Sequence, residues 1–239
     1  MEKNGFFYSR ETKGRKTAER GEKMKERYQI LYKGGEGEIV EKKSRFIACI
    51  EPVPSEEEAL AFIGAVRRRF WDARHHCYAY TVGENHETAR CSDDGEPSQT
   101  AGRPMLDVLL GRDIHNACAV VTRYFGGTLL GTGGLVRAYS GAVQEGLSSC
   151  VVLEKCLAYR WILRTDYSGL GKVQYLLAEA GLPVLESDYG AQVSLTVLVS
   201  ADQTGAARKK ITEGTNGRCA IEEGDALYFG MDGQTPVLL

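Results

Sequence analysis

The sequence has 239 residues, of which 43% are hydrophobic and 26% are charged, and its formal net charge at pH 7 is −2. This balance excludes a protein that coats nucleic acid through overall positive charge, so any contact with a polyanion must be a local patch. The sequence contains no apolar run near the roughly 20 residues that a membrane-spanning helix needs. It shows no apolar signal-peptide core either, so we expect a cytoplasmic location.

Residues 1–26 are polar and lack apolar periodicity, which predicts a disordered N-terminal extension. Two interpretations of this extension stay open. It is either a dispensable segment upstream of Met24 or a basic tail that contacts RNA.

The first half of the chain, residues 27–150, alternates between strand and helix patterns. A capping box of Ser55 and Glu58 begins the first helix. We expect the inward stripe of that helix to contain Leu60, Ile63, Val66 and Phe70. Strands are expected at residues 28–32, 38–41, 45–50, 77–82 and 117–121, and two further helices at 104–110 and 132–148.

The second half, residues 151–239, has a simpler order of strands and helices. Strands are expected at residues 156–165, 184–188, 191–200 and 220–229, and helices at 170–180 and 204–213. This βαββαβ order predicts an antiparallel sheet with both helices on one face. We therefore predict an α+β protein of two domains, 27–150 and 151–239, preceded by the disordered extension.

A glycine-rich segment is the most unusual feature of the chain. Between residues 121 and 139, a buried strand pattern is followed by five glycines within nine residues and then by a helical pattern. Backbone amides at such a turn can face an anion, because no Cβ blocks the approach and the helix start is electropositive. The Walker pattern is not met, since Thr132 stands where lysine is required. Tight packing of the helix on the sheet is an equally good explanation.

A polar loop carries three acids, Asp93, Asp94 and Glu96, around Gly95. The Asp-Asp-Gly-Glu-Pro run is favourable turn chemistry, and a turn alone explains Asp93. We expect Asp94 and Glu96 to orient Arg103 or Arg123 if these segments meet in space.

Cysteine and histidine chemistry finds little support in the pattern. The number of cysteines is odd, seven, and no Cys-x-x-Cys pair occurs, so free thiols are expected. A zinc site of His75, Cys77 and Cys91 would not match the usual closely spaced ligand pairs. A nucleophilic Cys77 beside His76 is disfavoured because adjacent strand residues face opposite sides. We expect no metal, no cofactor and no catalytic residues.

Four segments together resemble the IMPACT family, in its two-domain bacterial YigZ/YvyE-like branch. They are residues 43–47, 73–78, 92–105 and the glycine-rich segment, and the resemblance extends over about residues 28–230. It implies a first domain with the fold of ribosomal protein S5 domain 2, also seen in elongation factor G domain IV. It also implies a ferredoxin-like second domain similar to elongation factor G domain V.

The resemblance also carries functional expectations. Eukaryotic relatives regulate translation by competing for an activator of a starvation-sensing kinase, whereas bacterial members are suspected of binding nucleic acid or the ribosome. We see no counterpart of the N-terminal interaction domain of the eukaryotic proteins, so their kinase-pathway role is not expected here.

Our leading hypothesis is a non-enzymatic protein that binds RNA, the ribosome or a translation factor and regulates translation. Arginines would contact phosphate, a tyrosine would stack on a base and glycines would permit close approach. The alternatives are an enzyme that binds a nucleotide or phosphorylated small molecule through the 126–134 loop, with Asp94 or Glu96 as base or magnesium ligand, and a competitor for protein surfaces. The predicted binding residues are Arg74, His75, Asp94, Glu96, Thr100, Arg103, Arg123, Tyr124, Gly126, Gly127 and Arg137.

Overall fold

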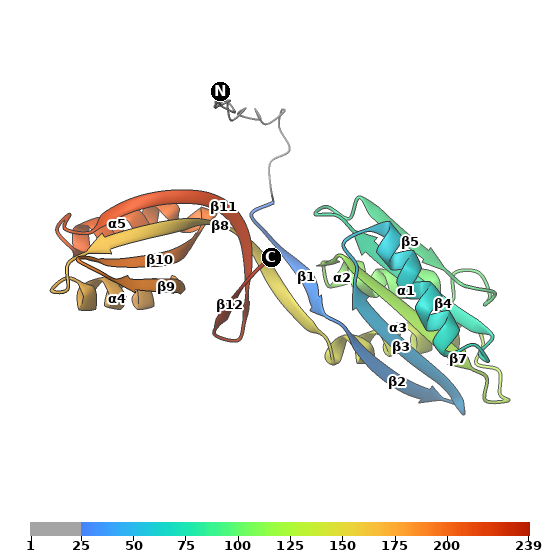
Figure 1. Ribbon diagram of the computed structural model, residues 1–239. Coiled ribbons are helices and arrows are strands. Elements are labelled where there is room, and N and C mark those ends of the chain that lie inside the picture. Colours follow the sequence, from blue (N-terminus) through green and yellow to red (C-terminus); the bar gives the residue numbers. More distant parts are fainter. Residues whose placement is uncertain (1–24) are drawn as a thin grey trace, which may run out of the picture.

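The computed structural model describes residues 25–239, which form an α+β protein built on two β-sheets (Figure 1). The extension predicted to be disordered lies outside the described residues except for its last two. None of the helices within the described part is long and apolar enough to cross a membrane.

The first sheet has five antiparallel strands in the order β2-β3-β7-β4-β5. Its strands are β2 (Gly35–Glu41), β3 (Ser44–Pro52), β4 (His75–Val82), β5 (Thr88–Ser92) and β7 (Ala117–Tyr124). Three helices accompany it, α1 (Glu56–Arg69), α2 (Gly102–Gly111) and α3 (Thr132–Ser148).

Both faces of this sheet are covered, so it forms the middle of three layers (Figure 1). Successive side chains of a strand point to opposite faces. In β3, Phe46 packs with α2 and α3, whereas its neighbour Ile47 packs with α1. The two large apolar clusters of this half therefore come from alternate residues of the same strands.

The first helix starts as predicted but presents a different face to the core. The Ser55 side chain accepts a hydrogen bond from the backbone N–H of Glu58, 3.2 Å away, as an N-cap does. The residues that α1 buries are Ala59, Ile63 and Val66. Leu60 is 54% exposed, so our placement of Leu60 in the inward stripe was wrong. Small Ala59 fits the close approach of the helix to the sheet at that turn.

The second sheet has seven strands and contains the predicted βαββαβ order. Its strands are β1 (Arg27–Lys33), β6 (Ile114–His115), β8 (Val151–Thr165), β9 (Val184–Tyr189), β10 (Val193–Ser200), β11 (Ala220–Asp232) and β12 (Thr235–Leu238). The segment from β8 to β11 pairs in the antiparallel order β9-β10-β8-β11. Helices α4 (Leu170–Glu179) and α5 (Thr204–Gly214) contribute to one apolar cluster with β8 and β10. They therefore share one face, as the pattern predicts, and a short 3₁₀ helix, Ala201–Gln203, precedes α5.

Strand β8 links the two halves of the chain (Figure 1). Its first part, from residue 151 to 156, pairs antiparallel with β1, and its later part, from 158 to 165, pairs with β10. Strand β1 also pairs in parallel with β6. The N-terminal strand is thus part of the sheet that carries the second half. The division into domains at residue 150 stays a prediction. Strand β8 begins directly after this predicted boundary.

A glycine contact sets the distance between α3 and the first sheet. A Cβ added to Gly37 on β2 would lie 2.5 Å from the backbone nitrogen of Gly146 on α3 and 2.8 Å from its Cα. Real Cβ atoms do not approach backbone atoms so closely, so the helix can reach this position only over a residue without a side chain.

We predict that Gly37→Ala destabilises the protein by about 1–3 kcal/mol, because the added methyl group must push α3 away from β2. The measurement is urea unfolding followed by circular dichroism. Gly205→Ala on α5 is the matched control, since its added Cβ would have nothing within 4 Å and alanine favours a helix. Equal stability of the Gly37→Ala variant and the wild type would contradict the packing argument.

Candidate functional site

A cavity of about 480 Å³ opens where β4 begins and β7 ends. The antiparallel register places His75 directly opposite Arg123. The loop before β4 and the glycine-rich segment after β7 therefore meet at this end of the sheet. The residues that line the cavity are Asp72, Ala73, Arg74, His75, Arg123, Tyr124, Phe125 and Leu129.

A buried ion pair forms the inner support of the cavity. The Arg123 Nη1 atom lies 2.6 Å from Glu96 Oε1, and the side chains of the two residues are only 8% and 4% exposed. The hydroxyl of Tyr139 on α3 donates to the same carboxylate oxygen over 2.8 Å. Glu96 therefore orients Arg123, as we expected, and also ties the polar loop to α3.

The guanidinium of Arg123 is only partly satisfied by this pair. Its Nε atom is buried and has no hydrogen-bond partner in the structure. Its carbon Cζ lies 5.4 Å from the ring centre of Phe46 and 5.6 Å from that of Phe125, within the range of cation–π contact. Arg123 is consequently held rigidly between two aromatic rings at the cavity wall.

Asp93, in the polar loop, caps the start of α2. This agrees with the purely structural role in a turn that we predicted for it. The Asp93 carboxylate accepts hydrogen bonds from the backbone N–H groups of Gln99, Ala101 and Gly102, over 2.8, 3.0 and 2.8 Å. The last two amides lie at the start of α2, where the helix has no carbonyl partners to offer them. Asp93 thus fixes the course of the loop.

Asp94 is a structural clamp and contacts neither of the arginines that we expected. Its Oδ1 atom accepts from Arg67 Nη2 over 2.7 Å, and its Oδ2 atom accepts from the backbone N–H of His76 over 2.7 Å. Arg103 instead pairs with Asp107 one helical turn away. Our expectation that Asp94 orients Arg103 or Arg123 was wrong, because the loop directs its carboxylate toward α1.

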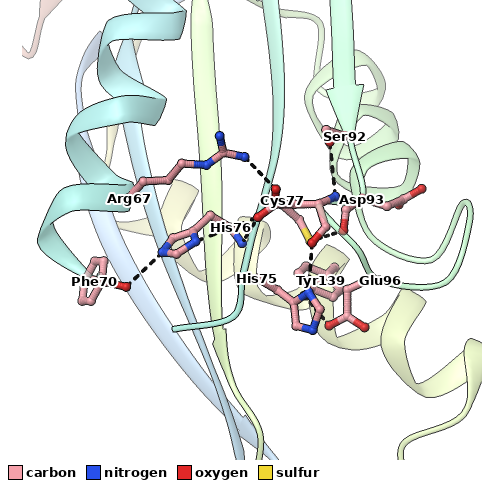
Figure 2. Close-up of polar contacts among 10 residues, drawn as sticks. Arg67, Phe70, His75, His76, Cys77, Ser92, Asp93, Glu96 and Tyr139 are labelled. Atoms are coloured by element: carbon pink, nitrogen blue, oxygen red, sulfur yellow. Dashed lines mark hydrogen bonds and ion pairs between the residues drawn. The ribbon is translucent and has the colours of Figure 1, made fainter. Parts of the chain in front are cut away.

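The histidines and Cys77 are held by backbone carbonyls (Figure 2). Nδ1 of His75 lies 2.9 Å from the Asp94 carbonyl, and Nε2 of His76 lies 3.1 Å from the Phe70 carbonyl. The Cys77 thiol donates to the Asp93 carbonyl over 3.0 Å, and burial raises the pKa of this thiol to about 12. A thiol with so high a pKa stays protonated at neutral pH, which argues against a nucleophilic role.

The two glycines that we predicted to permit close approach have different roles. A Cβ on Gly126 would lie 2.1 Å from the Lys43 carbonyl carbon, and the Gly126 N–H donates to Ser44 Oγ over 3.1 Å. Gly126 therefore allows the loop to pack on the turn between β2 and β3. Gly127 has a φ of 83° and nothing within 4 Å of an added Cβ. Its absent side chain leaves the backbone accessible.

The other predicted residues are distributed over the surrounding surface and core. Tyr124 lines the cavity, and its hydroxyl donates to Asp72 Oδ1 over 2.7 Å. This hydrogen bond is the main reason that the pKa of Tyr124 is raised. Thr100 is buried and its hydroxyl donates to the Pro97 carbonyl. Arg103 and Arg137 are exposed on α2 and α3, and neither lines the cavity.

Exposed apolar side chains near the cavity were absent from our prediction. Phe125 and Leu129 line it and are 58% and 82% exposed, and Trp71, which precedes the lining segment, is 81% exposed. The apolar residues in the loop before β4 and in the loop after β7 were the signal in the sequence that could have indicated this surface. Large apolar groups exposed around a concave surface mark sites of interaction.

We predict that Glu96→Gln destabilises the protein by about 3 kcal/mol, because it leaves the Arg123 charge buried without its carboxylate. Tyr139→Phe removes one hydrogen bond to the same oxygen and should cost only about 1 kcal/mol. Chemical unfolding of both variants and of the double variant measures these energies and their coupling. A Glu96→Gln cost no larger than that of Tyr139→Phe would show that the ion pair is not the main support.

Comparisons with known proteins match this arrangement to one family. The model of the Impact N-terminal domain matches residues 42–147, and that of a domain of unknown function (DUF1949) matches residues 163–218. The IMPACT family member YvyE of Bacillus subtilis is 44% identical over 202 residues, which cover 84% of this chain and 93% of YvyE. The IMPACT family member YigZ of Escherichia coli is 40% identical over 187 residues, covering 76% and 92% of the two chains.

A solved structure is also similar over most of its length. The crystal structure of a hypothetical protein shares 36% sequence identity with this chain at a TM-score of 0.54, covering 83% of this chain and 97% of the other. The family models, the bacterial relatives and this structure agree with the segments on which the resemblance rests. The chain therefore belongs to the IMPACT family.

Proposed function

We propose that the protein is a non-enzymatic RNA-binding protein that acts in translation and holds single-stranded RNA at the cavity where β4 begins and β7 ends. The observation that carries this proposal is the combination of an exposed guanidinium with exposed aromatic surface around one concave site. Arg74 lines the cavity, is exposed, and has no ion pair among the described residues. Phe125 offers an exposed ring on the same wall.

Single-stranded nucleic acid is bound by such combinations. Positive side chains follow the phosphates, and aromatic rings stack on bases without regard to their sequence. Arg123 takes a supporting part in this proposal, because its pair with Glu96 fixes the wall on which Phe125 lies. Phosphate would be contacted by Arg74, with the accessible backbone at Gly127 as a further donor.

The exposed ring of Phe125 favours RNA over a strongly acidic protein partner, because the ring offers a stacking surface for a base. Asp72 lines the cavity beside Arg74, so charge alone would not select either partner. A base stacked on Phe125 does not need a positive field. We regard a protein competitor as the less supported alternative for this reason.

An enzyme that uses the 126–134 loop has weaker support. The start of α3 at Gly131 has no side-chain cap, which suits an anion. The acids that such an enzyme would need are already engaged, however. Asp94 is bound by Arg67 and a backbone amide, and Glu96 by Arg123 and Tyr139. Both carboxylates thus already have structural partners, which leaves this alternative with less support.

The fold supports a place at the ribosome. We propose that the first half has the ribosomal protein S5 domain 2 fold and that the second half is ferredoxin-like, as in elongation factor G domain V. The β9-β10-β8-β11 order with both helices on one face supports the second assignment. A cytoplasmic location is part of this proposal. Ribosome-bound RNA is then the first target to test.

We expect Arg74→Ala to weaken binding to a fluorescent single-stranded RNA and to lower the salt slope of log K by about 0.7, the contribution of one phosphate contact on a single strand. Phe125→Ala should weaken binding at all salt concentrations without changing this slope, because stacking releases no counterions. Fluorescence anisotropy at several salt concentrations gives both quantities.

Arg112→Ala is the matched control, since Arg112 is also an exposed arginine but lies outside the cavity, at the end of α2. It should bind as the wild type does. If Arg112→Ala and Arg74→Ala weaken binding equally, charge acts without a defined site and the cavity is not the binding surface. Salt-insensitive association of the wild-type protein would reject RNA backbone contact altogether.

A further inference from the structure

A second cluster of chemically active side chains lies at the opposite end of β4 and β7. His86 follows β4 in the loop to β5, Asp113 follows α2, and His115 ends the short strand β6. One ligand-type atom from each of the three lies within 4.8 Å of the others. The imidazole rings of His86 and His115 are stacked, with centres 3.7 Å apart and planes inclined by 13°.

The backbone holds this cluster in place at some conformational cost. His86 and Asp113 both adopt positive φ angles, 54° and 50°, which residues other than glycine seldom adopt. Gly83 connects the two loops, because its N–H donates to Asn116 Oδ1 over 2.9 Å and its carbonyl lies 3.0 Å from His115 Nδ1. Such conformations persist where the surrounding structure over-determines them, and they gather at functional sites.

The contact with Gly83 determines which nitrogen of His115 is free. A carbonyl oxygen can only accept, so His115 Nδ1 must carry the hydrogen. In the neutral ring, Nε2 then carries a lone pair, and this atom lies 3.1 Å from Asp113 Oδ1. A backbone carbonyl on Nδ1 is the arrangement that prepares a histidine to bind metal through Nε2.

Two electron-rich atoms so close to one another require a positive charge beside them, either a proton on the imidazole or a cation. In the structure the Lys25 ammonium supplies such a cation, with its Nζ 3.4 Å from His115 Nε2. That distance is beyond the usual 2.7–3.2 Å of a nitrogen hydrogen bond to its acceptor. Lys25 also contacts the Glu84 carbonyl over 3.3 Å. The cluster thus attracts a cation, and the Lys25 ammonium meets this demand poorly.

We propose that His86, Asp113 and His115 form a binding site for a divalent transition-metal ion of the zinc class, and that Lys25 competes for it. The distances from Asp113 Oδ1 to the Nε2 atoms of His86 and His115 are 3.2 and 3.1 Å. Bonds of about 2.0–2.1 Å in a tetrahedron place ligand atoms about 3.3 Å apart, so the carboxylate has the right spacing from each imidazole. The two stacked rings must turn apart for both Nε2 lone pairs to meet at one ion. Two imidazoles and one carboxylate suit zinc better than magnesium or calcium.

The fourth position of the metal faces outward. The His115 side chain is 0% exposed, whereas that of Asp113 is 62% exposed, so the ion would enter from the Asp113 side. A water molecule would complete the coordination there, as in zinc sites with three protein ligands. The ion would join the loop after β4 to the loop between α2 and β6. It would also release Lys25 from the cluster.

The test is calorimetric titration of zinc chloride into the full chain after treatment with a chelator. We expect one equivalent to bind to the wild type and at least tenfold weaker binding by His86→Asn and by Asp113→Asn. Asparagine is chosen at both positions because it tolerates positive φ. Lys25→Gln should bind zinc more tightly than the wild type, an effect that a purely structural cluster would not produce.

His75→Gln and Cys91→Ser, which lie outside the cluster, are the controls and should bind one equivalent like the wild type. A second readout is the visible spectrum with cobalt, which is intense for tetrahedral coordination by nitrogen and oxygen. Absence of zinc binding by both the wild type and Lys25→Gln overturns the proposal. So does stoichiometric binding that persists in Asp113→Asn, or weaker binding by Lys25→Gln, provided that each variant keeps the wild-type circular dichroism spectrum.

Discussion

The buried pair of Arg123 and Glu96 is the interaction on which the first half of the chain depends most. It joins the end of β7 to the polar loop that Asp93 and Asp94 already attach to β4, and Tyr139 extends the connection to α3. A charged pair removed from water is costly unless further hydrogen bonds satisfy it. Here the shared carboxylate oxygen serves both partners, and two aromatic rings flank the guanidinium. The cavity beside it owes its fixed wall to this arrangement.

The local elements could be predicted from the sequence because their signals are local. Helix α3 has the predicted bounds, and the order of strands and helices in the second half follows from alternation and helical periodicity. Leu60 shows the limit of this reasoning. Leu60 lies only about 60° around the helix from buried Ile63. Which side of the stripe is covered depends on how α1 packs on the sheet, and a periodic pattern does not contain that information.

The candidate site could be predicted only in part, because its contacts also depend on packing. Glu96 and Arg123 are 27 residues apart, and a search for opposite charges in a polar loop can propose such a pair. That Asp94 turns instead to Arg67 depends on its φ of 43°, which directs the carboxylate toward α1. The cluster of His86, Asp113 and His115 was missed altogether. Its members are separated by a strand, a loop and a helix, and the pairing of β4 with β7 together with the contacts of Gly83 brings them together.

Strands β4 and β7 relate the two proposed sites to each other. They are antiparallel neighbours of eight residues each, so a cavity at one end and a histidine cluster at the other are separated by roughly 25 Å. The cavity lies at the far ends of these strands, whereas the histidine cluster touches β1, since the Tyr28 ring lies 5.1 Å from that of His115. Tyr28 in turn contacts Tyr228 of β11. A ligand at the cluster would therefore act first on the contact between the two halves, and RNA at the cavity would act on the outer end of the first half alone.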